Sequence, residues 1–390
     1  MIVRQFLQWQ RTAPAAERAD ATSALARAYL YSDLSPDDRA AAEGALLMLL
    51  DDPSPLVRGA LAQALASSDQ APPAVILGLA ADQPEIACWV LERSPLLVDA
   101  DLVDAVATNG PRAQLAIASR ACLPPAVSAA IAEVGSPEAC LVLVENARAE
   151  IAPFSLGRIV TRFGHLGAIR EAMLTRHDVP APIRQGLVAK LSQTLAGFVA
   201  ARKWLDQDRA QRIAKEACEK ATVILAAVSP GGEMRPLIRH LRESGQLTAG
   251  LVLRALLSGN VALFEQALAE LSGLPHARVS ALVHDNCGAG FRAILHKAGL
   301  PEFTYPAFCE AVEAMREGGF VGTARGATNL KRRMVERVLT RCAEHSLDDI
   351  EPLLTLLRRF AAEAAREEAR MLCHDLVAGA LPYESALAAA

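Results

Sequence analysis

Four short turns that contain proline recur at a nearly constant spacing in the first part of the chain. Pro53, Pro84, Pro111 and Pro137 lie 31, 27 and 26 residues apart, and a short apolar segment stands on each side of every turn. Such a period, with two short helices in each unit, is typical of repeat proteins, in which a unit buries its apolar face only by stacking on its neighbours. The spacing therefore predicts a helical solenoid over residues 1–178.

The first of these turns carries the strongest motif. Residues 46–65 form an apolar segment, an Asp-Pro turn and a second segment that begins with Val-Arg and continues in alanine and leucine. This stretch resembles a HEAT repeat. In that family an aspartate of the turn and an arginine of the second helix tie successive units together, and Asp52 and Arg58 stand at the matching positions. The later turns lack the Val-Arg pair, so their spacing alone assigns them to the array.

The composition indicates the same fold class for the rest of the chain. Apolar residues make up 52% of the 390 residues, but aromatic residues only 4%. Alanine and leucine dominate almost every segment, and both lose little conformational entropy in a helix. Alternating runs of β-branched and aromatic residues, which mark half-buried strands, are scarce. We therefore predict an all-α fold with a HEAT-like α-α superhelix, a helical connector and a C-terminal helical domain.

Two breaks divide the chain into three predicted segments. The repeat array ends at residues 177–182, which contain two prolines. Residues 179–234 are predicted to form a long helical connector, which closes at a Ser-Pro-Gly-Gly turn. Residues 235–390 are predicted to form a C-terminal domain of helix pairs, because glycines stand where its short apolar segments end.

The sequence also suggests a cellular location. No uncharged run reaches the length of about 18 residues that spans a bilayer, and the N-terminus lacks the pattern of a secretory signal. The eight cysteines are scattered singly, as expected of reduced residues that pack inside helices. These features predict a cytoplasmic protein.

Several segments resemble one bacterial family. Residues 264–275, 288–294 and 298–301, together with residues 91–102, are similar to the uncharacterised alphaproteobacterial family called domain of unknown function 2336. The resemblance extends to about residue 345. It implies a helical fold and a bacterial origin, but it supplies no catalytic residues.

The charge is distributed unevenly along the chain. Residues 1–150 contain 10 arginines, no lysine and 19 acidic residues, which gives −9, whereas residues 151–390 contain 30 basic and 25 acidic residues, which gives +5. Because DNA and RNA are polyanions, the acidic part cannot be a general nucleic-acid-binding surface. Nucleic acid is therefore not the expected partner.

The basic excess includes a predicted partner-binding stripe near the C-terminus. Arg333, Arg337 and Arg341 recur every four positions, so they lie on one face of a predicted helix. Arginines in this arrangement bind phosphate groups, nucleic acid or an acidic protein surface. The alternative is a solvated face, balanced in part by neighbouring glutamates. Further basic residues of the region are Arg325, Lys331 and Arg332, and the opposite side carries Val335, Val338, Leu339 and Cys342, which should pack inward.

The nearest approach to a metal or catalytic site is one mixed segment. His284, Asp285 and Cys287 lie within four residues, and His296 follows nine residues after the cysteine. Zinc sites need three or four converging ligands, usually in paired short spacings, and this segment has no second pair. A cysteine nucleophile activated by a histidine is the other interpretation. We assign ordinary structural roles to these residues and predict no metal, cofactor or catalytic residue.

Two further patterns allow a functional interpretation. The glycines around 288–290 and 318–322 lack the strand and the Lys-Ser/Thr pair of a phosphate-binding loop, so we assign them to helix ends. Some HEAT-like proteins are DNA glycosylases that use aromatic side chains, and Trp89 and Trp204 are available here. The acidic charge of residues 1–150 argues against a DNA substrate.

Our leading hypothesis is a non-enzymatic scaffold or regulatory module that binds a protein partner through its helical repeats. One alternative is a HEAT-type enzyme that acts on nucleic-acid bases or on a bound cofactor. Another is a regulatory module that senses a ligand through the arginine stripe. The opposite charges of the two parts also permit head-to-tail self-association.

Overall fold

The computed structural model describes residue 9 and residues 12–284, 288–318, 331–344 and 351–387. Within these ranges all regular secondary structure is helical, and one isolated bridge joins Leu123 to Ala149. The predicted all-α fold is therefore confirmed. The chain forms two compact units, residues 1–179 and 180–390. None of the described helices is both long and apolar enough to cross a membrane.

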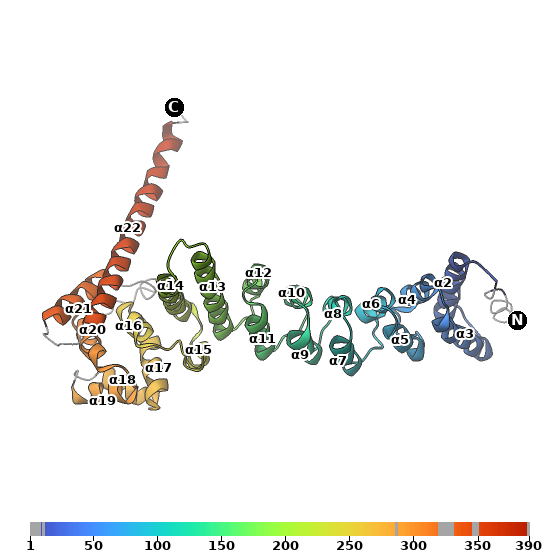
Figure 1. Ribbon diagram of the computed structural model, residues 1–390, viewed down its shortest axis with the longest axis horizontal. Coiled ribbons are helices and arrows are strands. Elements are labelled where there is room, and N and C mark those ends of the chain that lie inside the picture. The colour runs from blue at the N-terminus through green and yellow to red at the C-terminus, as the bar shows by residue number, and fades with distance from the viewer. Residues whose placement is uncertain (1–8, 10–11, 285–287, 319–330, 345–350, 388–390) are drawn as a thin grey trace. The chain divides into compact units, whose positions relative to one another are not determined.

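The first unit is a stack of short helices in two layers (Figure 1). One layer contains α2 (Ala15–Tyr31), α4 (Pro55–Leu65), α6 (Pro84–Arg93), α8 (Pro111–Ala118), α10 (Pro137–Glu145) and α12 (Gly167–Thr175). The other contains α3 (Pro36–Met48), α5 (Pro73–Ala80), α7 (Asp99–Thr108), α9 (Pro125–Val134) and α11 (Pro153–Phe163), with the 3-10 turn η1 (Leu49–Asp51) after α3. Each even-numbered helix packs on the next even-numbered one, and α7, α9 and α11 pack in the same way. The helices thus stack in the manner of a solenoid.

Proline explains where the even-numbered helices begin. Pro55, Pro84, Pro111 and Pro137 occupy the first turns of α4, α6, α8 and α10. Proline is favoured there because the first N–H groups of a helix have no partner within it, and because its φ angle already suits the helix. Ser136 adds a side-chain cap, since its hydroxyl accepts from the N–H of Ala139 at 3.1 Å. The turns predicted from proline spacing are therefore the starts of one layer of the stack.

The two residues of the HEAT-like motif do tie successive units together, each through a different partner. Asp52 accepts from Nε and Nη2 of Arg18 in α2, at 3.0 and 2.8 Å, and from the N–H of Ser54 at 2.8 Å. Arg58 donates to both carboxylate oxygens of Asp82 in the next turn, at 2.6 and 3.1 Å, and to the backbone carbonyl of Asp52 at 2.6 Å. Each turn aspartate is thus held by an arginine from the preceding unit.

Side chains at helix C-termini take over this role in the later units. Arg120, which follows α8, donates to the carbonyls of Leu91 and Ser94 at the end of α6, at 2.6 and 2.7 Å. Asn146 donates to the carbonyls of Ala118 at the end of α8 and of Arg120 just after it, and Arg176 donates to carbonyls at the end of α10. The last carbonyls of a helix lack partners within it and carry its negative dipole end. These contacts therefore stabilise the stack where the Val-Arg motif is missing.

The second unit begins with a hairpin of two long helices. These are α13 (Ala181–Ala201) and α14 (Gln207–Val228), followed by α15 (Gly231–Glu243), α16 (Ala249–Leu257), α17 (Val261–Ser272), α18 (His276–His284), α19 (Ala289–Lys297), the 3-10 turn η2 (Glu302–Thr304), α20 (Tyr305–Gly318), α21 (Arg332–Glu344) and α22 (Glu351–Leu387). Helix α13 packs on α14 and α15, and α14 packs on α16. Both hairpin helices thus belong with the C-terminal helices in this unit, and the division into three segments stays a prediction.

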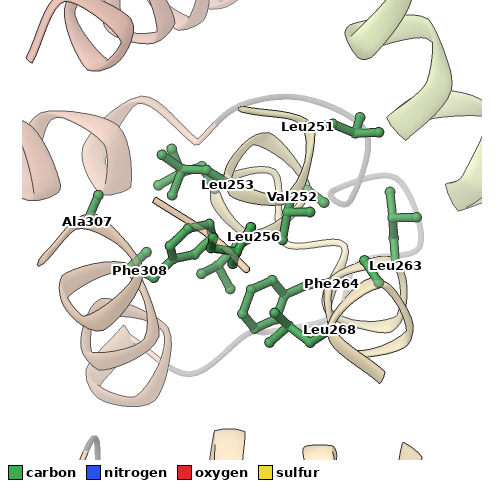
Figure 2. Packing of buried hydrophobic residues seen from close by; sticks show 14 of the residues in the cluster. Leu251, Val252, Leu253, Leu256, Leu263, Phe264, Leu268, Ala307 and Phe308 are labelled. Atoms are coloured by element: carbon green, nitrogen blue, oxygen red, sulfur yellow. The ribbon is translucent and has the colours of Figure 1, made fainter. Parts of the chain in front are cut away.

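Helix α16 lies at the centre of the second core (Figure 2). Every residue from Leu251 to Leu257 is buried, including the charged Arg254. Phe264 of α17 and Phe308 of α20 stack beside α16 with ring centroids 6.0 Å apart. Seven consecutive buried residues cover every face of a helix, so α16 is buried all round in this stretch.

Arg254 fastens α22 to this core. Its Nη1 donates to Oε1 of Glu363 at 2.8 Å, and its guanidinium lies 4.6 Å from the ring centroid of Phe360. Lys220 of α14 forms an ion pair with Glu367, and its Nζ lies 3.6 Å from Glu363 Oε1. A buried arginine must be paired, because an isolated charge is costly in an apolar interior.

Candidate functional site

The second unit contains a cavity of ≈ 1090 Å³ between α13, α14 and the segment that joins α15 to α16. On α13 it is lined by small residues that recur on one face, namely Ala189, Ser192, Ala196, Gly197 and Ala200. Residues one helical turn apart share a face, so these short side chains leave the seam between α13 and α14 unfilled. The cavity therefore follows from the side-chain size on α13.

The loop of the hairpin contributes to the cavity lining. Lys203 and Asp206 line the cavity and are exposed. Lys203 adopts a left-handed backbone conformation with φ 56°, which is uncommon for a residue with a side chain. Asp206 caps α14, since its carboxylate accepts from the N–H of Arg209 at 2.8 Å. The local sequence thus ends α13 and restarts the chain as α14 within a few residues.

Glu219 of α14 is a buried residue of the cavity lining. Its residue surface is 9% exposed, and its Oε1 accepts from the hydroxyl of Thr248 at 2.9 Å. Burial raises the pKa of this carboxyl, and the hydrogen bond from Thr248 opposes that shift. A β-carbon built on Gly250 would lie 3.6 Å from both carboxylate oxygens, so the glycine gives the acid room beside the start of α16. A buried carboxylate with one side-chain donor is the most unusual group of the cavity.

A second polar cluster includes Cys218, the residue before Glu219 in α14. Gln185 is fully buried, and its Nε2 donates to Oε1 of Gln246 at 2.7 Å, while its Oε1 lies 3.1 Å from His240 Nε2. The Cys218 thiol is 3.6 Å from Gln246 Oε1. Burial raises the pKa of Cys218 and lowers that of His240. Both shifts favour the uncharged thiol and the neutral imidazole.

The predicted arginine stripe lies on α21 and is partly engaged within the unit. Nη1 of Arg341 pairs with Glu310 and Glu313 of α20, at 2.7 and 3.2 Å. Arg337 is half-buried and takes part in interactions of its own, whereas Arg333 is exposed. On the opposite side Val335, Val338 and Cys342 are buried and Leu339 is partly buried, as the sequence predicted. Arg325 lies outside the described residues, and Arg332 pairs with Glu336 and Glu368.

In the segment considered for a metal or cysteine-nucleophile site, the described histidine His284 lies beside a buried glutamate. His284 Nε2 lies 3.0 Å from Oε1 of the buried Glu265, and His276 Nε2 lies 3.3 Å from Oε2 of the same carboxylate. Residues 285–287, with Asp285 and Cys287, lie outside the described residues, and His296 is exposed on α19. In the part of the chain that the structure describes, no group of three or more potential ligands could hold a metal ion.

The remaining candidates have local structural roles. Gly288 caps α19 and Gly290 lies in its first turn, as assigned from the sequence, whereas residues 319–330 are outside the described ranges. The guanidinium of Arg93 lies 4.8 Å from the ring centroid of the half-buried Trp89. Trp204 is 64% exposed and packs edge-on against Phe198. Only Trp204 is near the cavity, next to Lys203 in the chain.

The comparison with protein families gives one result. Residues 86–348 match the family described as an uncharacterised protein conserved in bacteria, DUF2336. The chain belongs to this family. The DUF2336 match includes every residue that lines the cavity and the whole of α21. No curated protein and no solved structure matches the chain.

Reading the sequence did not identify Glu219 or the cavity. Glu219 is one of several charged residues in α14, and Thr248, its hydrogen-bond donor, follows 29 residues later. The available signal was the face of small residues on α13. That signal gives no information about which side chain closes the space.

Proposed function

We propose that this DUF2336 protein is a non-enzymatic interaction scaffold whose first unit binds a basic segment of a protein partner. The stacked repeats support this proposal, since such stacks offer long, continuous surfaces. The observation that supports it most directly is a groove on α6, α8 and α10 that contains the exposed Leu115 and two carboxylates, Glu92 and Glu138.

The first unit carries an acidic excess, since residues 1–150 contain 19 acidic residues and 10 arginines. Arg18 and Arg58 are mostly buried and pair with turn aspartates, and Arg120 donates to backbone carbonyls between repeats. The two ion pairs are each neutral, so they leave the acidic excess of the unit unchanged. An acidic surface attracts basic partners and speeds their association.

The groove lies across α6, α8 and α10 and has a volume of ≈ 550 Å³. Leu115, which is 40% exposed, lines it together with Glu92 and Glu138. Arg112 also lines it, but its guanidinium pairs with Glu85. An apolar side chain between carboxylates suits a peptide that carries an apolar anchor and lysine or arginine residues.

Site-specific photo-cross-linking in the native bacterium tests the proposal. A photoreactive residue at position 115 is expected to capture a discrete protein partner with a basic segment. The same residue at Leu77 on α5, which is 50% exposed in the other layer, is the matched control. Equal capture at the two positions, or no discrete adduct at position 115, would contradict the proposed groove.

Neutralising variants show whether charge carries the interaction. Replacing Glu92 and Glu138 by glutamine should reduce capture at position 115 by about tenfold, because two ion pairs across an interface contribute on this scale. Replacing the exposed Asp104 and Glu150, which lie outside the groove, by asparagine and glutamine should leave capture unchanged. If the captured partner is a second copy of this chain, light scattering will show a mass that falls as salt rises.

The arginine stripe is proposed as a second contact surface, for an acidic protein or for a phosphorylated or nucleotide ligand that regulates binding. Arg333 is its most exposed member, whereas Arg341 also holds α20 and α21 together. Replacing Arg333 by glutamate therefore tests the stripe without disturbing that ion pair. Unchanged partner and ligand binding in this variant would exclude the second surface.

A further inference from the structure

We propose that the cavity of the second unit binds a small organic cation, an amine or guanidine on an apolar body, whose charged group forms an ion pair with Glu219. This inference is independent of the scaffold proposal, because the cavity and the groove lie in different units. It rests on the buried carboxylate of Glu219, on the small and apolar residues of the lining, and on the charges around the cavity.

The carboxylate of Glu219 lines the cavity, and the protein supplies only part of its hydrogen bonds. A carboxylate accepts several hydrogen bonds, whereas Thr248 supplies the one side-chain donor to Glu219 among the described contacts. Burying a charge without a partner is costly, and a ligand cation would remove that cost. The cationic group would then lie beside a buried carboxylate, where an ion pair is stronger than between exposed groups.

The walls suit an apolar body. The apolar part of the lining consists of the small residues of α13, Ala214 of α14, and Leu241 and Leu251 of α15 and α16. Polar groups stand beside it, including Gln193, Gln211 and Gln246. A β-carbon built on Gly197 would meet no atom within 4 Å, so the space beside this residue is open. The volume of ≈ 1090 Å³ is at the upper end of the range for small-molecule sites.

The charges around the cavity favour a cation over an anion. Glu219 is the one buried charged residue of the lining, and Lys203, Asp206 and Lys215 of the lining are exposed. The buried Arg254 of α16 does not line the cavity and already pairs with Glu363. Arg254 and, to a smaller extent, Lys215 lower the pKa of the Glu219 carboxyl, and both effects are smaller than the rise caused by burial. An anionic ligand would have to place its charge near the edge and an apolar part against the carboxylate. A ligand cation would place its charged group beside the Glu219 carboxylate and its apolar body against the apolar part of the lining.

Calorimetric titration of the full chain tests the proposal with defined probes. Hexylamine, benzylamine and agmatine carry the proposed groups, and hexanol, benzyl alcohol and hexanoate are counterparts of similar size without a cation. We expect the amines to bind with Kd values of about 10 µM to 1 mM, as befits ligands of this size, and the counterparts to show no binding. Binding of the alcohols or the carboxylate as tightly as the amines would overturn the proposal.

Two substitutions locate the binding. Glu219→Gln preserves the shape and should weaken amine binding by about tenfold or more, the scale expected for loss of a buried charge pair. Gly197→Leu fills the open space and should abolish binding while Glu219 stays in place, so the test holds even if the first variant folds poorly. The controls are Gly197→Ala, which adds one carbon, and Glu243→Gln, which removes an exposed carboxylate outside the cavity.

The combined result decides the assignment. Loss of binding in both test variants and retention in both controls supports the cation site. Unchanged amine binding in Glu219→Gln, or in a folded Gly197→Leu variant, would overturn it, as would the absence of binding by every amine at about 10 mM.

Discussion

Replacing Asp52 by alanine should destabilise the start of the repeat array far more than replacing an exposed ion-pair partner. The Asp52 side chain is 2% exposed and that of Arg18 is 15% exposed, and two hydrogen bonds join them. Removing one partner of a buried pair costs roughly 3–5 kcal/mol, because the remaining charge is left without compensation. Arg18 keeps its bond to the carbonyl of Ala13 at 2.8 Å, so we expect the lower end, about 3 kcal/mol.

The matched control is Glu85→Ala. Glu85 pairs with Arg112 on the surface, where the side chains are 56% and 68% exposed. Exposed pairs of this kind contribute only about 0–1 kcal/mol, because water screens them. The two variants thus remove a carboxylate from the same layer of the stack and differ mainly in burial.

Hydrogen exchange of the full chain is the suitable assay, since a protein of two units need not unfold in one step. A loss of 3 kcal/mol should speed exchange of the protected amides of α2 and α4 by about a hundredfold, whereas Glu85→Ala should change exchange by less than about fivefold. Removing both Arg18 and Asp52 should cost less than removing Asp52 alone, because no buried charge remains. Equal exchange in Asp52→Ala and Glu85→Ala would refute the reasoning.

Three further predictions concern other parts of the chain. Gly197→Ala should raise the melting temperature and stabilise α13 by about 0.5–1 kcal/mol, because the added carbon has room and alanine favours the helix. Asn146→Ala should destabilise the repeat array by about 1–2 kcal/mol in denaturant titration, because two helix-terminal carbonyls lose their donor. Burial lowers the pKa of His240 below its usual 6.5, so the unfolded chain binds more protons below that pH and the stabilising contribution is lost on acidification. Melting temperatures between pH 8 and 5 should therefore fall less steeply for His240→Gln than for the unmodified protein, and parallel curves would contradict this account.

Local sequence patterns predicted the architecture of the first unit because they act within a few residues. Proline at the first turn of a helix fixes where that helix begins, and the constant spacing of Pro84, Pro111 and Pro137 repeats that start along the chain. The buried side of α21 was also predictable, because apolar residues at helical spacing select the face that packs inward. The family could be recognised from short segments because these, too, are local sequence patterns.

Partners that lie far apart in the chain could not be predicted in this way. The motif around Asp52 and Arg58 indicated a tie between units, but which aspartate meets which arginine depends on how adjacent helices stack. Arg341 has the helical spacing of a surface stripe, yet α20 places two glutamates beside it. A sequence pattern shows that a side chain shares a face with others, and it does not show what lies against that face.

The cavity is the clearest case of this division. The sequence by itself determined that α13 and α14 are long helices and that α13 has a face of small residues. Only the tertiary structure decided that this face meets Glu219, and that Thr248 and Gly250 of another segment enclose the carboxylate. The physical reason is range: helix formation and facial periodicity depend on neighbours within about four residues, whereas a cavity is formed by side chains that only packing brings together.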